Sequence, residues 1–256
     1  MTSTGLFDLT GKVALITGSG QGLGLVIARG MAQAGATVVL NDMNAEVLAA
    51  AVSSLSAEGL PVHASAFNVT DAAQIAEQIP RVERELGPIQ ILYNNAGIQR
   101  RSPLEDCDEA LWREVLDVNL TGIFLVTRQV VRGMIARRAG KIINMCSMMS
   151  EVGRPTTAPY TTSKGGVKML TKAMAVDWAK HNIQVNGIGP GYMLGGMGAA
   201  VAKDPAFHAW ICSRTPAGRW GDPAELVGAA VFLASAASNY INGHIIYVDG
   251  GMLATL

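Results

Sequence analysis

The sequence has few cysteines and no run of charge of either sign. Its three cysteines, Cys107, Cys146 and Cys212, show no CxxC or zinc-ligand spacing, and three cannot all pair within one chain. We therefore expect reduced thiols, no structural metal and a cytoplasmic protein. The formal net charge is zero and only 16% of the residues are charged. No basic stripe of the kind that binds nucleic acid is present, so a nucleic-acid partner is not expected.

Long hydrophobic runs are also missing. The longest apolar runs lie near 123–126 and 228–237 and are far shorter than the roughly 20 residues that a membrane-spanning helix needs. The first residues, MTSTGLFDLTGK, lack the apolar region of a signal peptide. We therefore expect no membrane association. Because 49% of the 256 residues are apolar and 29 are glycines, a large core with closely packed elements is expected.

Short apolar runs alternate with helical patterns along the whole chain. Strands are expected at 12–16, 37–40, 61–67, 89–93, 141–146, 183–188 and 244–248. Helices are expected at 25–35, 45–58, 71–86, 109–137, 159–181 and 223–234, with two short ones inside 193–214. Short β-α-β connections imply parallel strands with right-handed crossovers. The pattern predicts a single doubly wound, Rossmann-like α/β domain over 1–256, with a seven-stranded parallel sheet and helices on both faces.

A glycine-rich turn follows the first expected strand and opens the first helix. Its sequence, TGSGQGLG at 17–24, has the spacing TGxxxGxG, wider than the usual GxGxxG fingerprint. Glycines let the backbone approach a pyrophosphate, and the helix start supplies free N–H groups and a positive dipole end. The turn therefore predicts a dinucleotide site, and a glycine turn without ligand is the alternative. The expected contacts are Gly18, Ser19, Gln21, Gly22, Leu23 and Gly24.

Polar residues end the second and fourth expected strands. Asp42 lies about twenty residues beyond the glycine turn, where a carboxylate binds adenosine ribose hydroxyls and repels the 2′-phosphate of NADP. The turn offers no arginine or lysine to offset this repulsion, so NAD is the expected cofactor and NADP the second choice. Asn95, Ala96 and Gly97, within NNAG at 94–97, suit a cofactor crevice at a strand's carboxyl end. A solvated acid and an asparagine-capped turn are the alternatives.

Tyr160 and Lys164 are four residues apart near the start of an expected helix, so they lie on one face. A free tyrosine has a pKa of about 10 and is a poor proton shuttle near neutral pH. An ammonium about 4 Å away, at an effective dielectric near 20, supplies the roughly 4 kcal/mol that lowers this pKa towards 7. We therefore expect Lys164 to acidify the phenol. A half-buried aromatic beside a solvated lysine is the alternative.

Together these motifs resemble the short-chain dehydrogenase/reductase family. The glycine turn, NNAG, Asn119, Ser147, YxxxK at 160–164 and PG at 190–191 occur in the family's order and spacing over essentially the whole chain. The resemblance implies reversible hydride transfer between a nicotinamide cofactor and a ketone or secondary alcohol. It also implies a dinucleotide-binding half of about 1–150, a catalytic and lid half of about 147–256, and a homotetramer built through the long helices and last strand.

The resemblance gives each catalytic position a role. Tyr160 would exchange a proton with the substrate oxygen, and Lys164 would lower its pKa and hold the nicotinamide ribose. Ser147 would hydrogen-bond the substrate oxygen, unless it bonds only local backbone. Asn119 would help hold a water that relays protons to Lys164, although an asparagine that bends its own helix fits as well. Further cofactor contacts are expected from Asn68, Val69, Pro190, Gly191 and Met193.

Longer phrases outside the motifs, among them NNAGIQRRSPLE and TPAGRWGDPAELVGAAVFL, are similar to family members that act on gluconate. This implies 5-keto-D-gluconate and D-gluconate as substrates. Because arginine binds carboxylates bidentately, we expect Arg101 as a substrate ligand and Arg154 as a second, with solvated loop arginines as the alternative. Trp210, in the segment 193–214, is expected to cover the substrate or to pack against a neighbouring subunit. Gly195 stands where relatives usually have a cofactor-contacting threonine.

Two other functions are compatible with the sequence. The same chemistry fits another carbonyl compound, such as a sugar alcohol's ketone, a 3-oxoacyl thioester or a hydrophobic ketone. A nucleotide-binding module without turnover also fits the fold, but such proteins usually lose the tyrosine or the lysine, and both are present here.

Overall fold

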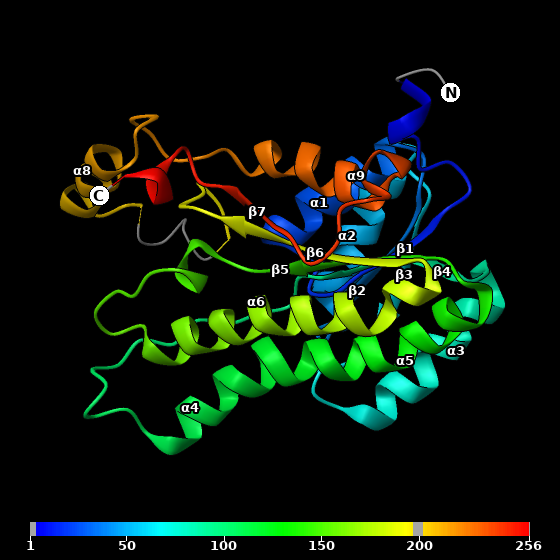
Figure 1. The fold of residues 1–256 in the computed structure, drawn as a ribbon, viewed down its shortest axis with the longest axis horizontal. Coiled ribbons are helices and arrows are strands. Elements are labelled where there is room, and N and C mark those ends of the chain that lie inside the picture. The colour runs from blue at the N-terminus through cyan, green and yellow to red at the C-terminus, as the bar shows by residue number, and fades with distance from the viewer. Residues whose placement is uncertain (1–3, 197–201, 256) are drawn as a thin grey trace.

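A parallel sheet forms the centre of the computed structural model, which describes residues 4–196 and 202–255 (Figure 1). Within that part the sheet has seven strands in the order β3-β2-β1-β4-β5-β6-β7, and every pair is parallel. The strands are β1 Val13–Ile16, β2 Thr37–Asp42, β3 Val62–Ala66, β4 Ile89–Asn94, β5 Gly140–Met145, β6 Ile183–Pro190 and β7 Ile245–Val248. The predicted doubly wound sheet is confirmed.

Helices cover both faces of the sheet (Figure 1). The α-helices of the described residues are α1 Gly22–Gln33, α2 Ala45–Ala57, α3 Ala72–Leu86, α4 Glu109–Leu116, α5 Gly122–Arg137, α6 Ala158–Trp178, α8 Pro205–Arg214 and α9 Val227–Ala234. Helices α1, α2 and α9 lie on one face, and α3 to α6 lie on the other. Each face has its own hydrophobic core. Leu40 packs in the core beneath α1, α2 and α9, and its neighbour Val39 packs in the core on the other face, because successive strand residues point to opposite faces. None of the described helices is long and apolar enough to cross a membrane.

Several boundaries differ from the expected ones, and two of these differences lie near the carboxyl edge of the sheet. The expected helix over 109–137 contains a π-helical turn, Asp117–Thr121, between α4 and α5. Strand β2 continues through Asn41 and Asp42 because both pair with β3. In the segment 193–214 the structure describes one helix, α8, and the other expected helix falls partly on residues outside the described ranges.

The sheet order places the carboxyl ends of β1 and β4 side by side. The chain leaves β1 towards β2 on one side, and β4 starts the other half of the sheet. Ligands of open α/β sheets bind at such a switch point, in the crevice outside the carboxyl ends of the strands. The fold therefore predicts a ligand site at the loops that follow β1, β2, β4, β5 and β6.

Candidate active site

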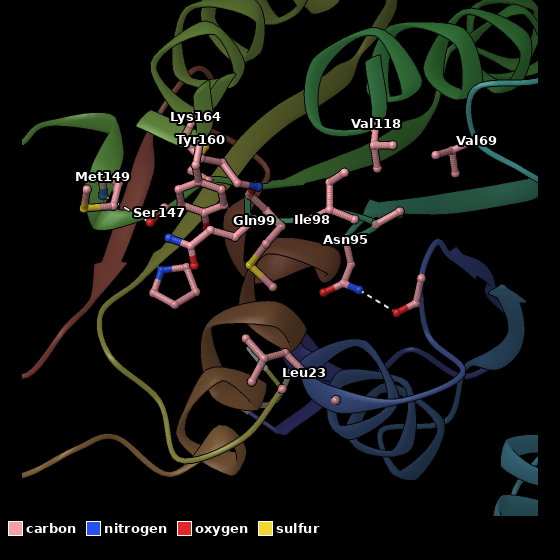
Figure 2. A pocket seen from close by; sticks show the side chains of 18 of the residues that line it. Leu23, Val69, Asn95, Ile98, Gln99, Val118, Ser147, Met149, Tyr160 and Lys164 are labelled. Carbon is pink, nitrogen blue, oxygen red and sulfur yellow. Dashed lines mark hydrogen bonds between the residues drawn. The ribbon is translucent and has the colours of Figure 1, made fainter. Parts of the chain in front are cut away.

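A cleft of about 1150 Å³ opens along this carboxyl edge. It is lined by the glycine turn after β1, the ends of β2 and β3, the segment after β4, the loop after β5, the start of α6 and the segment after β6. Figure 2 shows side chains from these separate elements facing a common space, with Tyr160, Ser147 and Lys164 at one end and Leu23 of α1 across from them. Widely separated sequence motifs thus meet in one cavity.

The glycine turn is joined tightly to the end of β4. Asn95 Nδ2 donates to the carbonyl oxygen of Thr17 at 3.0 Å and to that of Gly18 at 2.8 Å, the second bond being drawn in Figure 2. Thr17 Oγ1 in turn accepts from the N–H groups of Asn95 and Ala96. Gly18 has φ +60°, and a Cβ there would lie 2.7 Å from the Cα of Ala96, so only glycine fits this approach.

The start of α1 suits a pyrophosphate. Its N-cap residue, Gln21, makes no side-chain cap, so the first N–H groups of the helix are not capped by that residue. Gly18, Gln21, Gly22 and Leu23 all line the cleft next to these groups. Free N–H groups, a positive helix end and a backbone without side chains fit the phosphates of a dinucleotide.

Ser19 and Gly24 were expected to contact the cofactor, but neither is among the residues that line the cleft. Ser19 is fully buried; its hydroxyl donates to the Ile16 carbonyl at 2.7 Å and its backbone N–H donates to Asn41. A Cβ on Gly24 would lie 2.5 Å from the carbonyl oxygen of Gly18. Both residues therefore support the turn from behind and do not face the cleft, because the turn folds over them.

Asp42 and Asn68 lie at the other end of the cleft, together with Val69. Asp42 Oδ1 accepts from the Asn44 N–H at 3.0 Å, and its carboxylate occupies the space above Gly20. Asn68 Oδ1 accepts from the N–H and the hydroxyl of Thr70. The basic side chains among the described lining residues all come from other segments, namely Arg100, Arg101, Arg154 and Lys164.

Tyr160, Ser147 and Lys164 form a compact buried group (Figure 2). Ser147 follows β5, and its hydroxyl oxygen accepts from the Met149 N–H at 3.1 Å; Ser147 and Tyr160 both line the cleft. Burial raises the pKa of Tyr160 to about 12, and the nearby Ser147 hydroxyl opposes part of this rise. Burial lowers the pKa of Lys164 to about 8. Lys164 Nζ donates to the Met145 carbonyl oxygen at 2.6 Å.

The expected acidification of Tyr160 by Lys164 is wrong for this structure. The ammonium nitrogen lies 5.7 Å from the centre of the tyrosine ring, and its hydrogen bond goes to the backbone of β5. Loss of hydration on burial therefore outweighs the attraction between a phenolate and the ammonium. The expectation assumed a partly solvated pair, whereas both side chains are buried.

Asn119 lies behind the cleft, in the π-helical turn. Its side chain accepts from the Ile98 N–H at 2.8 Å and donates to the Ile98 carbonyl oxygen and to Ser163 Oγ. These bonds use both amide hydrogens and one of the two lone pairs of the amide oxygen, so the second lone pair can still accept from a water. Asn119 therefore joins the segment after β4 to α6, and its role in holding a water stays a prediction.

Three arginines line the substrate end of the cleft. Arg100 pairs with Glu114 at 2.9 Å. Arg101 Nε donates to Thr156 Oγ1 at 3.1 Å. Arg154 Nη1 donates to the Tyr192 hydroxyl at 3.1 Å, and its guanidinium carbon lies 4.3 Å from the centre of the Phe207 ring. Both predicted substrate residues thus reach the cavity that contains Tyr160.

Helix α8 brings aromatic rings to this end. Phe207 and Trp210 stack at 5.7 Å, and the Tyr192 ring meets both edge-on. Trp210 stays 44% exposed. The ring cluster packs on Arg154, and the cover over the substrate and the contact with a neighbouring subunit both stay predictions. Tyr192, Phe207 and Thr156 were not expected at the site, and no short motif marks them.

The segment after β6 completes the cleft. Pro190, Gly191 and Met193 line it at the end of this strand. Leu194 N–H donates to the Gly221 carbonyl oxygen at 2.8 Å, which ties the segment to the start of the 223–234 region. A Cβ on Gly195 would lie 2.9 Å from the ring of Pro223. A threonine at this position would therefore require Pro223 to shift.

Comparison with known proteins gives a consistent result. Residues 18–253 match the family model described as enoyl-(acyl carrier protein) reductase. The chain is 53% identical over 251 residues to the 5-keto-D-gluconate 5-reductase of Escherichia coli K12, covering 98% of this chain and 99% of that protein. It is 49% identical to the gluconate 5-dehydrogenase of Gluconobacter oxydans over the full length of both.

A solved structure is equally similar. The gluconate 5-dehydrogenase of Burkholderia cenocepacia, in complex with NADP and tartrate, superposes with a TM-score of 0.96 at 50% identity. The superposition covers 99% of this chain and all of that one. The single-domain arrangement is therefore shared over the whole length.

Proposed function

The chain belongs to the short-chain dehydrogenase/reductase family, and we propose that it interconverts 5-keto-D-gluconate and D-gluconate. The general reaction is the NAD(P)-dependent interconversion of a ketone and a secondary alcohol by hydride transfer. The observation that carries the sugar-acid proposal is that Arg101 and Arg154 line the same cleft as Tyr160 and Ser147. A carboxylate held by an arginine would place the sugar's carbonyl carbon near the phenol.

The catalytic roles follow from the buried group. When bound, the nicotinamide supplies or accepts the hydride. Tyr160, whose raised pKa keeps the phenol protonated at neutral pH, donates a proton to the ketone oxygen as reduction proceeds. Ser147 hydrogen-bonds the same oxygen and stabilises its developing charge. Lys164 is protonated below about pH 8, and its positive charge stabilises the phenolate that Tyr160 becomes after giving up its proton.

The dinucleotide would lie along the first half of the chain, about 1–150, and the substrate against the second, about 147–256. Asn95 and Ala96 would hold the nucleotide from the β4 side, with Gly97, Pro190, Gly191 and Met193 near the nicotinamide. Ser19, Gly24 and Asn119 would act indirectly by shaping the turn and the neighbouring helix. The remaining cofactor contacts would be Gly18, Gln21, Gly22, Leu23, Asp42, Asn68, Val69, Tyr160 and Lys164.

NAD is the proposed preferred cofactor. The support is the carboxylate of Asp42 at the end of β2 and the lack of an arginine or lysine among the described lining residues of the glycine turn and of β2 and β3. A 2′-phosphate beside an ionised carboxylate is repelled. The Burkholderia relative binds NADP, so catalytic efficiency with both reduced cofactors must be compared directly. A clear NADPH preference would overturn this proposal.

A nicotinamide absorbance assay with 5-keto-D-gluconate tests the substrate. We expect oxidation of the cofactor that requires the sugar acid. Activity confined to a 3-oxoacyl thioester, a hydrophobic ketone or a sugar alcohol's ketone would favour the alternative substrate. The description of the matching family names an acyl-carrier-protein substrate, so a thioester belongs in the panel. The two arginines favour the sugar acid.

A homotetramer and a cytoplasmic location are also proposed. On the long helices, Phe124 of α5 and Met169 and Val176 of α6 are 44%, 59% and 79% exposed. Exposed apolar side chains on neighbouring helices suit contact with another subunit. Light scattering after gel filtration tests the assembly.

A further inference from the structure

The substrate end of the cleft carries more positive charge than one carboxylate neutralises. Among the described lining residues the acids are Asp42, at the far end, and Glu114. Glu114 is already paired with Arg100. Within the described ranges Arg101 and Arg154 have no carboxylate partner. Two uncompensated guanidinium groups therefore face the same cavity.

Each of these guanidinium groups donates one hydrogen bond within the protein and has further nitrogens that can bind an anion. Arg101 uses Nε for Thr156 Oγ1, so both of its terminal nitrogens lack an acceptor among the described residues. Arg154 lies over the Phe207 ring and uses only Nη1, for the Tyr192 hydroxyl. A ring against the face of a guanidinium leaves its N–H edges free to bind an anion. Each group can therefore donate hydrogen bonds to its own carboxylate.

One short loop anchors both groups. Arg154 belongs to this loop, and Thr156, which holds Arg101, comes two residues later. Two residues of extended chain span at most about 7 Å, so the two anchoring points are close. Both guanidinium groups are thus tied to the same short segment, and both line the cleft that contains Ser147 and Tyr160.

We propose that this end of the cleft binds sugar acids that carry a carboxylate at each end of the carbon chain, one at Arg101 and one at Arg154. The chemical class is that of the six-carbon dicarboxylic hydroxy acids and their oxo forms. This inference rests on the proposed function, because it extends the same site from one carboxylate to two.

The test compares D-glucarate with D-gluconate, which differ only in a carboxylate or a CH₂OH group at C6. Binding is measured by calorimetry on enzyme saturated with NADH, in which neither acid can be oxidised. We expect D-glucarate to bind roughly tenfold more tightly at low ionic strength, as one added charge-assisted contact predicts. The difference should shrink as salt is added, since exposed charges are screened.

Three variants assign the effect. Arg154→Met should bring the two acids to similar affinity, whereas Arg154→Lys, which keeps the charge, should retain part of the preference. The double variant R100M/E114Q removes a compensated pair without changing net charge and should keep the full preference. Circular dichroism melting of each variant identifies any that fails to fold, in which case Arg154→Lys carries the comparison.

Equal binding of the two acids by the wild-type enzyme would overturn the inference. So would a loss of preference in R100M/E114Q equal to that in Arg154→Met. The proposed function is tested separately by reduction of 5-keto-D-gluconate. If that turnover is absent while D-glucarate still binds more tightly, the substrate assignment fails and the two-carboxylate site stands.

Discussion

The ammonium nitrogen of Lys164 lies 5.7 Å from the centre of the Tyr160 ring and gives its hydrogen bond to the backbone of β5. Burial raises the pKa of the phenol, which is therefore neutral near pH 7. Burial lowers the pKa of the lysine to about 8, so the lysine loses its charge near that pH. This combination suits proton donation to a ketone. It also gives the reaction a pH dependence that belongs to the lysine.

The efficiency of ketone reduction should fall as pH rises through about 8. Burial sets the pKa of Lys164 at about 8, below its usual 10.5, so its positive charge is present below that pH and lost above it. We expect a single break near 8 in kcat/KM for NADH, which reports the free enzyme. Lys168→Arg, on the same helix but paired with Glu151, should keep the break. A profile that stays flat to pH 9.5 would contradict the assignment.

Removing the charge of Asp42 should shift the cofactor preference. Asp42→Asn keeps the size of the side chain and removes the repulsion of a 2′-phosphate, so the ratio of kcat/KM for NADPH to that for NADH should rise about tenfold, equivalent to one favourable charge contact. The matched control is Glu46→Gln, which removes an acid from the first turn of α2. A ratio that moves equally in both variants would show a general charge effect.

Thr156 should act as a positioning residue for Arg101. It has φ +66°, a left-handed conformation that is costly for a β-branched residue, and its Oγ1 accepts from Arg101. Its carbonyl oxygen also accepts from the Ser102 N–H, so the turn holds the segment after β4. Thr156→Val should raise KM for 5-keto-D-gluconate about three- to tenfold with little change in kcat, since one hydrogen bond to a charged group is lost.

Thr156→Ser supplies the control, because it keeps the hydroxyl and should restore the KM. KM for a neutral ketone should be the same in both variants. If the valine variant raises KM equally for the acid and the neutral ketone, the residue only shapes the loop.

The fold and the catalytic cluster were predictable because local patterns dictate them. Buried parallel strands appear as apolar runs such as 37–40, and Tyr160 and Lys164 must share a helix face at a spacing of four. The inward turn of Ser19 depends on contact with Asn41 of the next strand. The hydrogen bonds of Asn119 depend on Ile98 and Ser163. Such contacts join distant segments, so no local pattern encodes them.

The pKa values and charge contacts of the site could not be predicted from the sequence. The pKa of Tyr160 depends on how completely the phenol is buried and on where Lys164 sends its hydrogen bond. The aromatic cluster around Arg154 joins Tyr192 after β6 with Phe207 and Trp210 of α8. Neither spacing nor composition relates these positions.

A methyl group at Gly195 should destabilise the protein. A Cβ there would lie 2.9 Å from the ring of Pro223, whereas a Cβ on Gly228, in α9, would meet nothing within 4 Å. Gly195→Ala should therefore lower Tm by about 2–4 °C, for an overpacking cost of about 1 kcal/mol, and Gly228→Ala should leave Tm unchanged or raise it. Equal Tm values for the two variants would show that the segment after β6 shifts without cost.

The central claim is that the Tyr160 hydroxyl donates the proton to the ketone, and the most direct measurement is the rate of 5-keto-D-gluconate reduction by Tyr160→Phe. With the fold checked by circular dichroism and NADH binding by fluorescence, we predict a kcat lower by about 10² to 10⁴, the usual contribution of a general acid. Wild-type turnover in a folded, NADH-binding Tyr160→Phe enzyme would contradict the account.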